Sequence, residues 1–218
     1  MMTMTLVLGL GINYAALFHQ SVKDLLPYVA VGLVIWSFLS SSISEGGEAF
    51  VMAGSLLKQS PLPLPLFIMR CLIRNAINLA HQVVIIAAVL LWFRIFPGPA
   101  ALWALAGLAL MFVNLSWAGL LLAMISTRFR DLPQIVSATL QLVFFLSPIF
   151  WKPPAALQGS PLVWANPFYF SIQSVREPLL HGVMPPQTLD FLAPMAVIGW
   201  IVTILAYNQT RRRVVHYL

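Results

Sequence analysis

The sequence predicts an all-α integral membrane protein with six transmembrane helices and short interfacial helices on the outer face. Its 218 residues are 60% hydrophobic and only 8% charged, and the mean hydropathy is +0.89. A soluble domain carries roughly a quarter charged residues. Apolar stretches long enough to cross a bilayer recur along the chain, with few charges inside them. We therefore predict one transmembrane domain over residues 1–218.

The predicted spans are separated by turns and loops that hold the acidic and most of the basic residues. They cover about 2–18, 28–44, 78–96, 102–125, 132–151 and 191–207. The fifth span is the best defined, because its 20 residues contain no charge. At 1.5 Å rise per residue, such a helix is about 30 Å long, which matches the hydrocarbon core. Pro148 predicts a break near its outer end.

A basic turn with Arg128, Arg130 and Asp131 precedes the fifth span. Asp131 and Gln134 have the spacing of a capping box, and Pro133 is tolerated in the first helical turn. Lys and Arg are enriched on the cytoplasmic side of membrane helices. We therefore expect this turn to lie at the cytoplasmic edge of the membrane.

The distribution of basic residues predicts the orientation of the chain. If the 45–74 segment and the C-terminus are inside, the inner face holds eight Lys and Arg residues and the outer face four. This excess predicts cytoplasmic N- and C-termini. The inner residues are Lys58, Arg70, Arg74, Arg128, Arg130, Arg211, Arg212 and Arg213, and the outer ones are Lys23, Arg94, Lys152 and Arg176.

Two long segments between spans have a distinct composition. The inner segment, 45–74, contains Glu45, Glu48 and Lys58, with a short helix expected at 48–58. Its alternating prolines at 61, 63 and 65 favour an extended connector. The outer segment, 152–190, is expected to be a periplasmic helical region.

A helix start is predicted within this outer segment, because Asn166 can act as N-cap and Pro167 as first helical residue. Apolar and polar side chains then alternate at helical spacing, which predicts an amphipathic helix at the outer interface. The apolar set is Phe168, Ile172, Val175 and Leu179, and the polar set is Ser171, Gln173, Ser174 and Arg176.

Motifs of intrinsic catalysis are absent from the sequence. There is no Walker A, GxSxG or HExxH pattern, the four histidines are scattered, and Cys71 is the single cysteine. We therefore expect no catalytic residue, no metal site and no cofactor bound by this chain. The six acids fall at predicted span ends or in loops. That placement disfavours an ion-driven carrier, which usually needs an ionisable group inside the membrane.

Polar residues gather on one face at the inner end of the third span, namely Arg74, Asn78, His81 and Gln82. They could line a substrate path, or they could form hydrogen bonds between packed helices, which we favour slightly. The aromatic residues Trp36, Phe144 and Phe145 lie deeper within spans. They could contact a sugar chain, although lipid-facing or core packing is the more ordinary role.

Four blocks of the sequence resemble polysaccharide ABC exporter permeases, the membrane subunits that export O-antigen, capsule or teichoic acid chains. The order and spacing of the blocks match, and together they cover most of the chain. The blocks are DLLPYVAVGLVIWSFLSSSISEGGEAF (24–50), RNAINLAHQ (74–82), FRDLPQIVSATLQLVFFLSPIFW (129–151) and NPFYFSIQSVREPLLHG (166–182).

The resemblance implies a homodimer in the bacterial inner membrane that binds two copies of a separate ABC ATPase, which carries the ATP and Mg. Glu45, Glu48 and Lys58, in the 45–65 segment, would contact that ATPase. A lipid-linked polysaccharide would pass through the dimer interface, where the candidate glycan contacts are Trp36, Phe144, Phe145 and Tyr169. Short outer helices in 151–182 would cap the exit. Membrane lipids, and no nucleic acid, complete the expected partners.

One departure from the family pattern concerns the start. Members usually begin with a cytoplasmic amphipathic segment, whereas here Met1 nearly begins the first span. We therefore expect a truncated or mis-assigned start, or an incomplete copy. Three alternative functions stay open: an ABC exporter of a drug or lipid, an ATP-independent channel or carrier, and a membrane-embedded enzyme of glycan assembly. The absence of acidic pairs argues against the enzyme.

Overall fold

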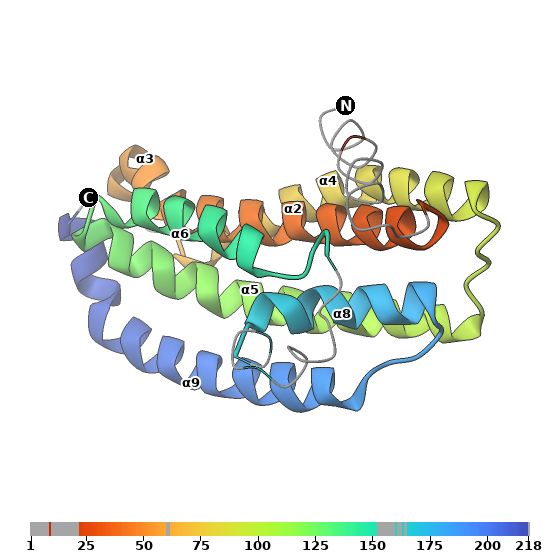
Figure 1. The fold of residues 1–218 in the computed structure, drawn as a ribbon. Helices are drawn as coiled ribbons and strands as arrows, with labels where there is room; N and C mark the ends of the chain where they lie inside the picture. Colours follow the sequence, from red (N-terminus) through yellow and green to blue (C-terminus); the bar gives the residue numbers. More distant parts are fainter. Residues whose placement is uncertain are drawn as a thin grey trace.

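The computed structural model describes residues 9, 22–59, 62–151, 160, 163 and 165–217, with side chains described as far as residue 210. The elements within these residues are all helical and run mostly side by side along one long axis (Figure 1). They are α2 (Val22–Met52), α3 (Gly54–Gln59), α4 (Pro65–Trp92), η1 (Pro99–Leu102), α5 (Trp103–Arg128), α6 (Leu132–Leu146), α8 (Pro167–Leu180) and α9 (Pro186–Tyr217).

Four helical stretches in the described part of the chain are long and apolar enough to cross a membrane: α2, α4, η1 with α5, and α9. They contain most of the predicted second, third, fourth and sixth spans. The predicted first span, 2–18, lies outside the described residues except for residue 9. Four of the six predicted spans therefore have a matching long helix.

The helix that corresponds to the predicted fifth span is shorter than expected. Helix α6 ends at Leu146, and Ser147 is extended, with φ −83° and ψ 140°. The cause is Pro148, because a residue that precedes proline is driven out of the helical region. The 15 residues of α6 make a helix of about 22 Å, which is less than the hydrocarbon thickness. The prediction of a continuous helix to residue 151 is therefore wrong for residues 147–151.

The start of α6 also differs from the prediction. Asp131 occupies the N-cap position, but its side chain makes no capping hydrogen bond, and its φ and ψ of −84° and −11° are helical. A side-chain cap requires an extended N-cap residue. The capping box with Gln134 is therefore absent, whereas Pro133 does lie in the first turn.

The predicted inner segment, 45–74, is largely helical. Helix α2 continues through Glu45 and Glu48 to Met52, and α4 begins at Pro65, a position at which proline is tolerated. The short helix expected at 48–58 is divided between α2 and α3. The extended connector is reduced to the few residues before α4, of which 62–64 are described.

Small residues allow α2 and α5 to approach closely near this end. A Cβ built on Gly46 would lie 3.1 Å from the Cα of Gly119. Small-residue contacts of this kind let membrane helices pack backbone to backbone. This close crossing explains why α2 remains helical through the glycine pair at 46 and 47.

Helix α2 is the centre of the bundle. It packs against α4, α5, α6 and α8, and most of its apolar side chains are buried. The other long helices keep many large apolar side chains exposed, among them Val84, Trp92, Leu105 and Val197. A broad exposed apolar surface is the one that a membrane would cover.

Helix α8 is buried on the face that the sequence predicted to be polar. It packs beside α2, α5 and α9 within the bundle (Figure 1), and its expected polar face, including Ser171, Ser174 and Arg176, is buried. The two hydroxyls donate to carbonyl oxygens of their own helix, at 2.8 and 2.7 Å. They can therefore pack as small residues. The predicted start is confirmed, because the Asn166 side chain accepts hydrogen bonds from Phe168 N and Tyr169 N.

Candidate substrate groove between α2 and α6

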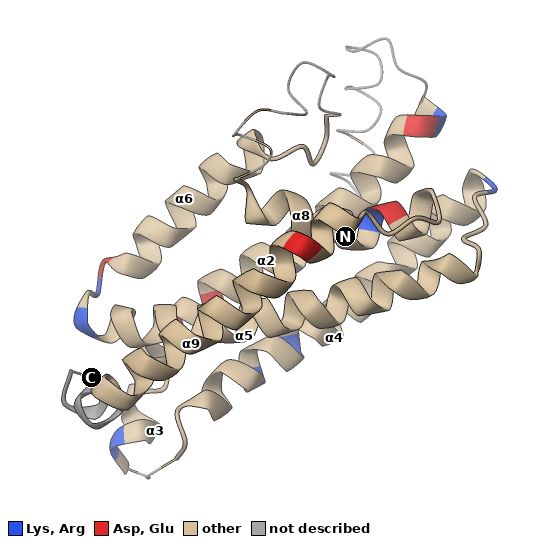
Figure 2. Cartoon of the chain, turned by 90° about the horizontal axis from the view of Figure 1, so that it is seen from below, with Lys and Arg blue, Asp and Glu red and all other residues tan. Residues whose placement is uncertain are grey.

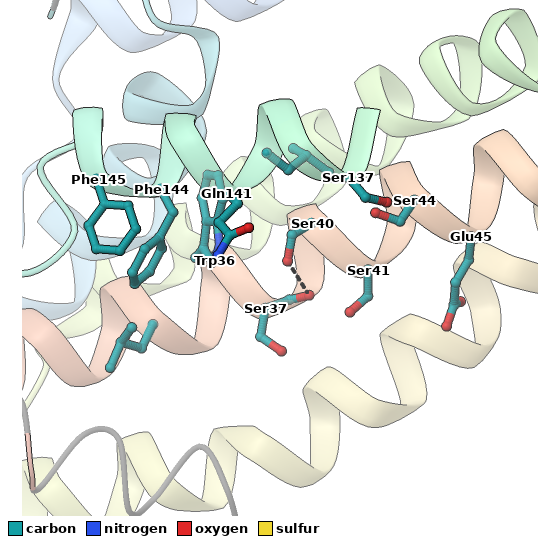
Figure 3. Close-up of a pocket in the computed structure, with 12 residues that line it drawn as sticks. Trp36, Ser37, Ser40, Ser41, Ser44, Glu45, Ser137, Gln141, Phe144 and Phe145 are labelled. Atoms are coloured by element: carbon teal, nitrogen blue, oxygen red, sulfur yellow. Dashed lines mark hydrogen bonds between the residues drawn. The ribbon is translucent and has the colours of Figure 1, made fainter. Parts of the chain in front are cut away.

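A groove of about 690 Å³ lies between α2 and α6 (Figure 3). It has a polar part and an aromatic part, and its far end is marked by Glu45. The residues from α2 are Leu33, Trp36, Ser37, Ser40, Ser41, Ser44 and Glu45, and those from α6 are Ser137, Leu140, Gln141, Phe144 and Phe145.

Serine hydroxyls form the polar part of the groove. Ser37, Ser40, Ser41 and Ser44 have i, i+3, i+4 and i+7 spacing, which places them on one face of α2. Ser40 Oγ donates to Ser37 O at 3.3 Å. Ser137 and Gln141 lie across from them on α6 (Figure 3). Sequence reasoning gave these residues no role in a site, although their helical spacing was a usable signal.

Three of the four predicted glycan contacts meet at the aromatic end. The ring centroids of Trp36 and Phe144 are 5.6 Å apart, and those of Phe144 and Phe145 are 5.2 Å apart. Tyr169 is not among the groove residues. Its ring packs 5.4 Å from that of Phe170, and its hydroxyl accepts a hydrogen bond from Gln173 Nε2 at 3.3 Å.

Glu45 connects the groove to helix α4. Its carboxylate forms an ion pair with Arg74 at 2.6 Å and accepts a hydrogen bond from Asn75 Nδ2, also at 2.6 Å. Glu45 was predicted as a contact for the ATPase and Arg74 as a lining residue. The structure pairs these two side chains with each other. Sequence reasoning missed Asn75, whose side chain is buried between the two helices.

The other predicted polar lining residues lie close together. Asn78, His81 and Gln82 border a recess of about 250 Å³ beside Ser37 and Ser41 of α2. This recess adjoins the serine face of the groove, because both share those two serines. His81 Nδ1 lies 2.7 Å from Ile77 O of its own helix. Polar side chains of α4 thus face the hydroxyls of α2.

The predicted contacts for a partner protein lie at one end of the bundle. Glu48, near the end of α2, and Lys58, on α3, are both exposed. Arg128, Arg130 and Asp131 are exposed in the α5–α6 turn, at the same end of the molecule as α3 (Figures 1 and 2). The length of α6 beyond this turn carries no charge (Figure 2). A charged end therefore adjoins a groove whose lining residues, apart from Glu45, are uncharged.

Comparison with known proteins relates the whole arrangement to membrane transport. The sequence model of the ABC-2 type transporter family matches residues 1–180. The chain is 22% identical over 191 residues to the O-antigen export system permease protein RfbA of Klebsiella pneumoniae. The aligned region covers 85% of this chain and 73% of that protein. A second Klebsiella pneumoniae protein of the same name is 19% identical over 188 residues, with the same coverage.

Proposed function

This chain belongs to the ABC-2 type transporter family, and on that basis we propose that it is the permease subunit of an exporter for a polysaccharide or lipid-linked glycan. In this proposal a separate ABC ATPase binds ATP and Mg and supplies the energy. The permease acts as a homodimer in the bacterial inner membrane. The similarity to proteins named as O-antigen export permeases supports the choice of substrate class.

The groove between α2 and α6 is the observation that carries this proposal. Sugars present hydroxyl groups at their edges and apolar C–H faces above and below the ring. The groove offers both complements, because serine hydroxyls line one part and the rings of Trp36, Phe144 and Phe145 line another. A site of a few polar groups within a mostly apolar wall is typical of small-molecule recognition.

The charged end of the bundle is the proposed contact surface for the ATPase. Glu48, Lys58 and the 128–131 turn form this surface, which is exposed and lies next to the Glu45 end of the groove. A movement of α2 or α6 imposed at this end would change the groove directly. Within the described part of the chain, helix α6 makes its main contacts with α2 and α5. Exposed apolar side chains near its start, such as Ile135, are the proposed contact with a second copy.

Purification of the tagged chain from its native cells, followed by an ATPase assay, tests the proposal. We expect a separate ATPase subunit to copurify. Glu48→Lys and Lys58→Glu should weaken its recovery, since both side chains are exposed on the proposed surface. Lys23→Glu is the matched control, because Lys23 is exposed at the opposite end of α2.

Two results would contradict the proposal. Absence of any copurified ATPase would exclude the ABC mechanism and favour a channel or carrier. The second experiment deletes the gene for this chain and measures the surface polysaccharide of the cells. If the ATPase copurifies but the deletion strain keeps its polysaccharide, export of another substrate, such as a drug or lipid, is favoured. Loss of that polysaccharide, restored by the wild-type chain, supports glycan export.

A further inference from the structure

Arg176 is a fully buried cation without an acidic partner. Its side chain has 0% exposure. Among the described residues, no ion pair joins Arg176 to an acid, and the carboxylate of Glu177, its neighbour in the sequence, instead pairs with His181 at 2.8 Å. An unpaired buried charge is costly, and in a membrane protein it suggests a functional role. The contacts of Arg176 define that role.

The Arg176 guanidinium binds the backbone that follows α6. Nη1 donates to Pro148 O at 3.0 Å, and Nη2 donates to Ile149 O at 3.2 Å. The group also lies 3.7 Å from the ring centroid of Tyr28 on α2, whose hydroxyl donates to Pro148 O at 3.1 Å. One side chain of α8 therefore joins α2 to the end of α6.

The break after α6 requires such donors. Residues 147–151 are not helical, and Ser147, Ile149 and Phe150 are buried. Buried backbone carbonyls outside a helix need hydrogen bonds from other parts of the protein, above all at membrane depth. Asn166, which caps α8, adds a further link by donating from Nδ2 to Ser147 Oγ at 2.8 Å.

Gly32 on α2 provides the space for this contact. A Cβ at this position would overlap Arg176 Nη2 and would lie 2.8 Å from Ile149 O. Alanine at position 32 would therefore separate the arginine from the carbonyls without removing its charge. The buried Nε of Arg176 has no hydrogen-bond partner among the described residues. A ligand-binding role is nevertheless disfavoured, because the side chain is inaccessible and both Nη atoms, which form the outer end of the group, already have partners.

We propose that Arg176 is a positioning residue that holds the break after α6 against α2 and thereby sets the width of the groove. Phe144 and Phe145 precede Pro148 by about one helical turn, so the angle of α6 at the break determines where their rings lie. That this width matters for transport rests on the proposed function. The mechanical role itself does not, since it follows from the contacts of Arg176.

Cysteine accessibility in membrane vesicles tests this role in the full-length chain. In a Cys71→Ser background, Leu140→Cys reports on the groove, because Leu140 is buried at its wall. Leu72→Cys is the comparison position, because Leu72 is also buried but lies on α4, away from the groove. The probe is a maleimide fluorophore, and the measurement is its labelling rate. No ATPase subunit or ATP is required.

We expect Arg176→Gln and Gly32→Ala each to raise labelling at position 140 several-fold, with no change at position 72. Tyr28→Phe should produce a smaller rise, because it removes one hydroxyl and keeps the ring. Ile172→Ala is the matched control. It creates a cavity at a buried position one turn earlier on α8 but leaves the carbonyl contacts intact, so labelling at 140 should stay unchanged.

Two outcomes would overturn the inference: unchanged labelling at position 140 in both Arg176→Gln and Gly32→Ala, or an equal rise in Ile172→Ala or at position 72. If Arg176→Gln and Gly32→Ala fail to accumulate in the membrane, Tyr28→Phe decides. A rise in labelling at position 140 in that variant supports the role of Arg176, and no rise refutes it. Failure of ATPase copurification would refute the proposed function and leave this result intact. Likewise, unchanged labelling at position 140 would refute the role of Arg176 and leave the proposed function intact.

Discussion

Arg74 on α4 and Glu45 on α2 form an ion pair of 2.6 Å at the point where the groove meets the charged end of the bundle. Their side chains are 60% and 37% exposed, respectively. A pair with this much solvent contact contributes little stability, about 0–1 kcal/mol. Its position between two long helices suggests that it keeps α2 and α4 in register.

Glu45→Arg should reduce export, because it places two cations against each other at the α2–α4 contact. The double variant Glu45→Arg with Arg74→Glu restores opposite charges and should recover most of the activity. Surface polysaccharide in a deletion strain measures export, and immunoblotting measures the amount of chain in the membrane. No recovery in the double variant would show that Glu45 acts through another contact.

Phe145→Ala should impair export without destabilising the chain. Phe145 lines the groove but is 59% exposed, so its loss creates no cavity in the core. Leu142→Ala is the matched control, because Leu142 lies on the same helix with 67% exposure and does not line the groove. Equal effects of the two substitutions on export would argue against a specific role for the ring.

Ser41→Leu should block the groove, whereas Ser41→Ala should have a small effect. Ser41 borders both the main groove and the adjoining recess, so a larger side chain would fill the space that they share. The readout is export measured as surface polysaccharide, normalised to the amount of permease. Full export by Ser41→Leu would exclude this part of the groove from the substrate path.

Gly46→Ala and Gly47→Ala should have opposite effects on thermal stability. A Cβ on Gly46 would lie 3.1 Å from the Cα of Gly119, and this overpacking should cost about 1–3 kcal/mol. A Cβ on Gly47 would lie 3.8 Å from that of Leu122, an ordinary contact. Alanine there should stabilise the helix by up to about 1 kcal/mol. Unfolding of the detergent-solubilised variants checks both values, and equal shifts would refute the packing argument.

The long helices were predictable because each contains an uninterrupted apolar run. Their ends were less predictable, since α2 continues past residue 44 to Met52, and α4 begins well before residue 78, at Pro65, and ends at Trp92 rather than at residue 96. Glu45, Glu48 and Arg74 belong to these extensions, where helix packing and an ion pair stabilise residues that hydropathy assigns to a loop. Hydropathy measures what a membrane can accept, and it does not show where a helix stops.

The candidate site was predictable in part. The aromatic residues Trp36, Phe144 and Phe145 were named from sequence and do meet at the groove. Tyr169 was also named, but it packs on α8 beside Phe170. Sequence position cannot separate these cases, because the direction of a side chain depends on how its helix is rotated against its neighbours.

The sequence by itself determined that the chain is helical, apolar and built for a membrane, and that α6 must end near Pro148, because these properties belong to continuous runs of residues. Only the tertiary structure decided that Arg176 is buried rather than exposed at an interface. Its partners, Tyr28 and the Pro148 and Ile149 carbonyls, are 148, 28 and 27 residues away along the chain. A long-range contact of this kind depends on how α2, α6 and α8 pack in space.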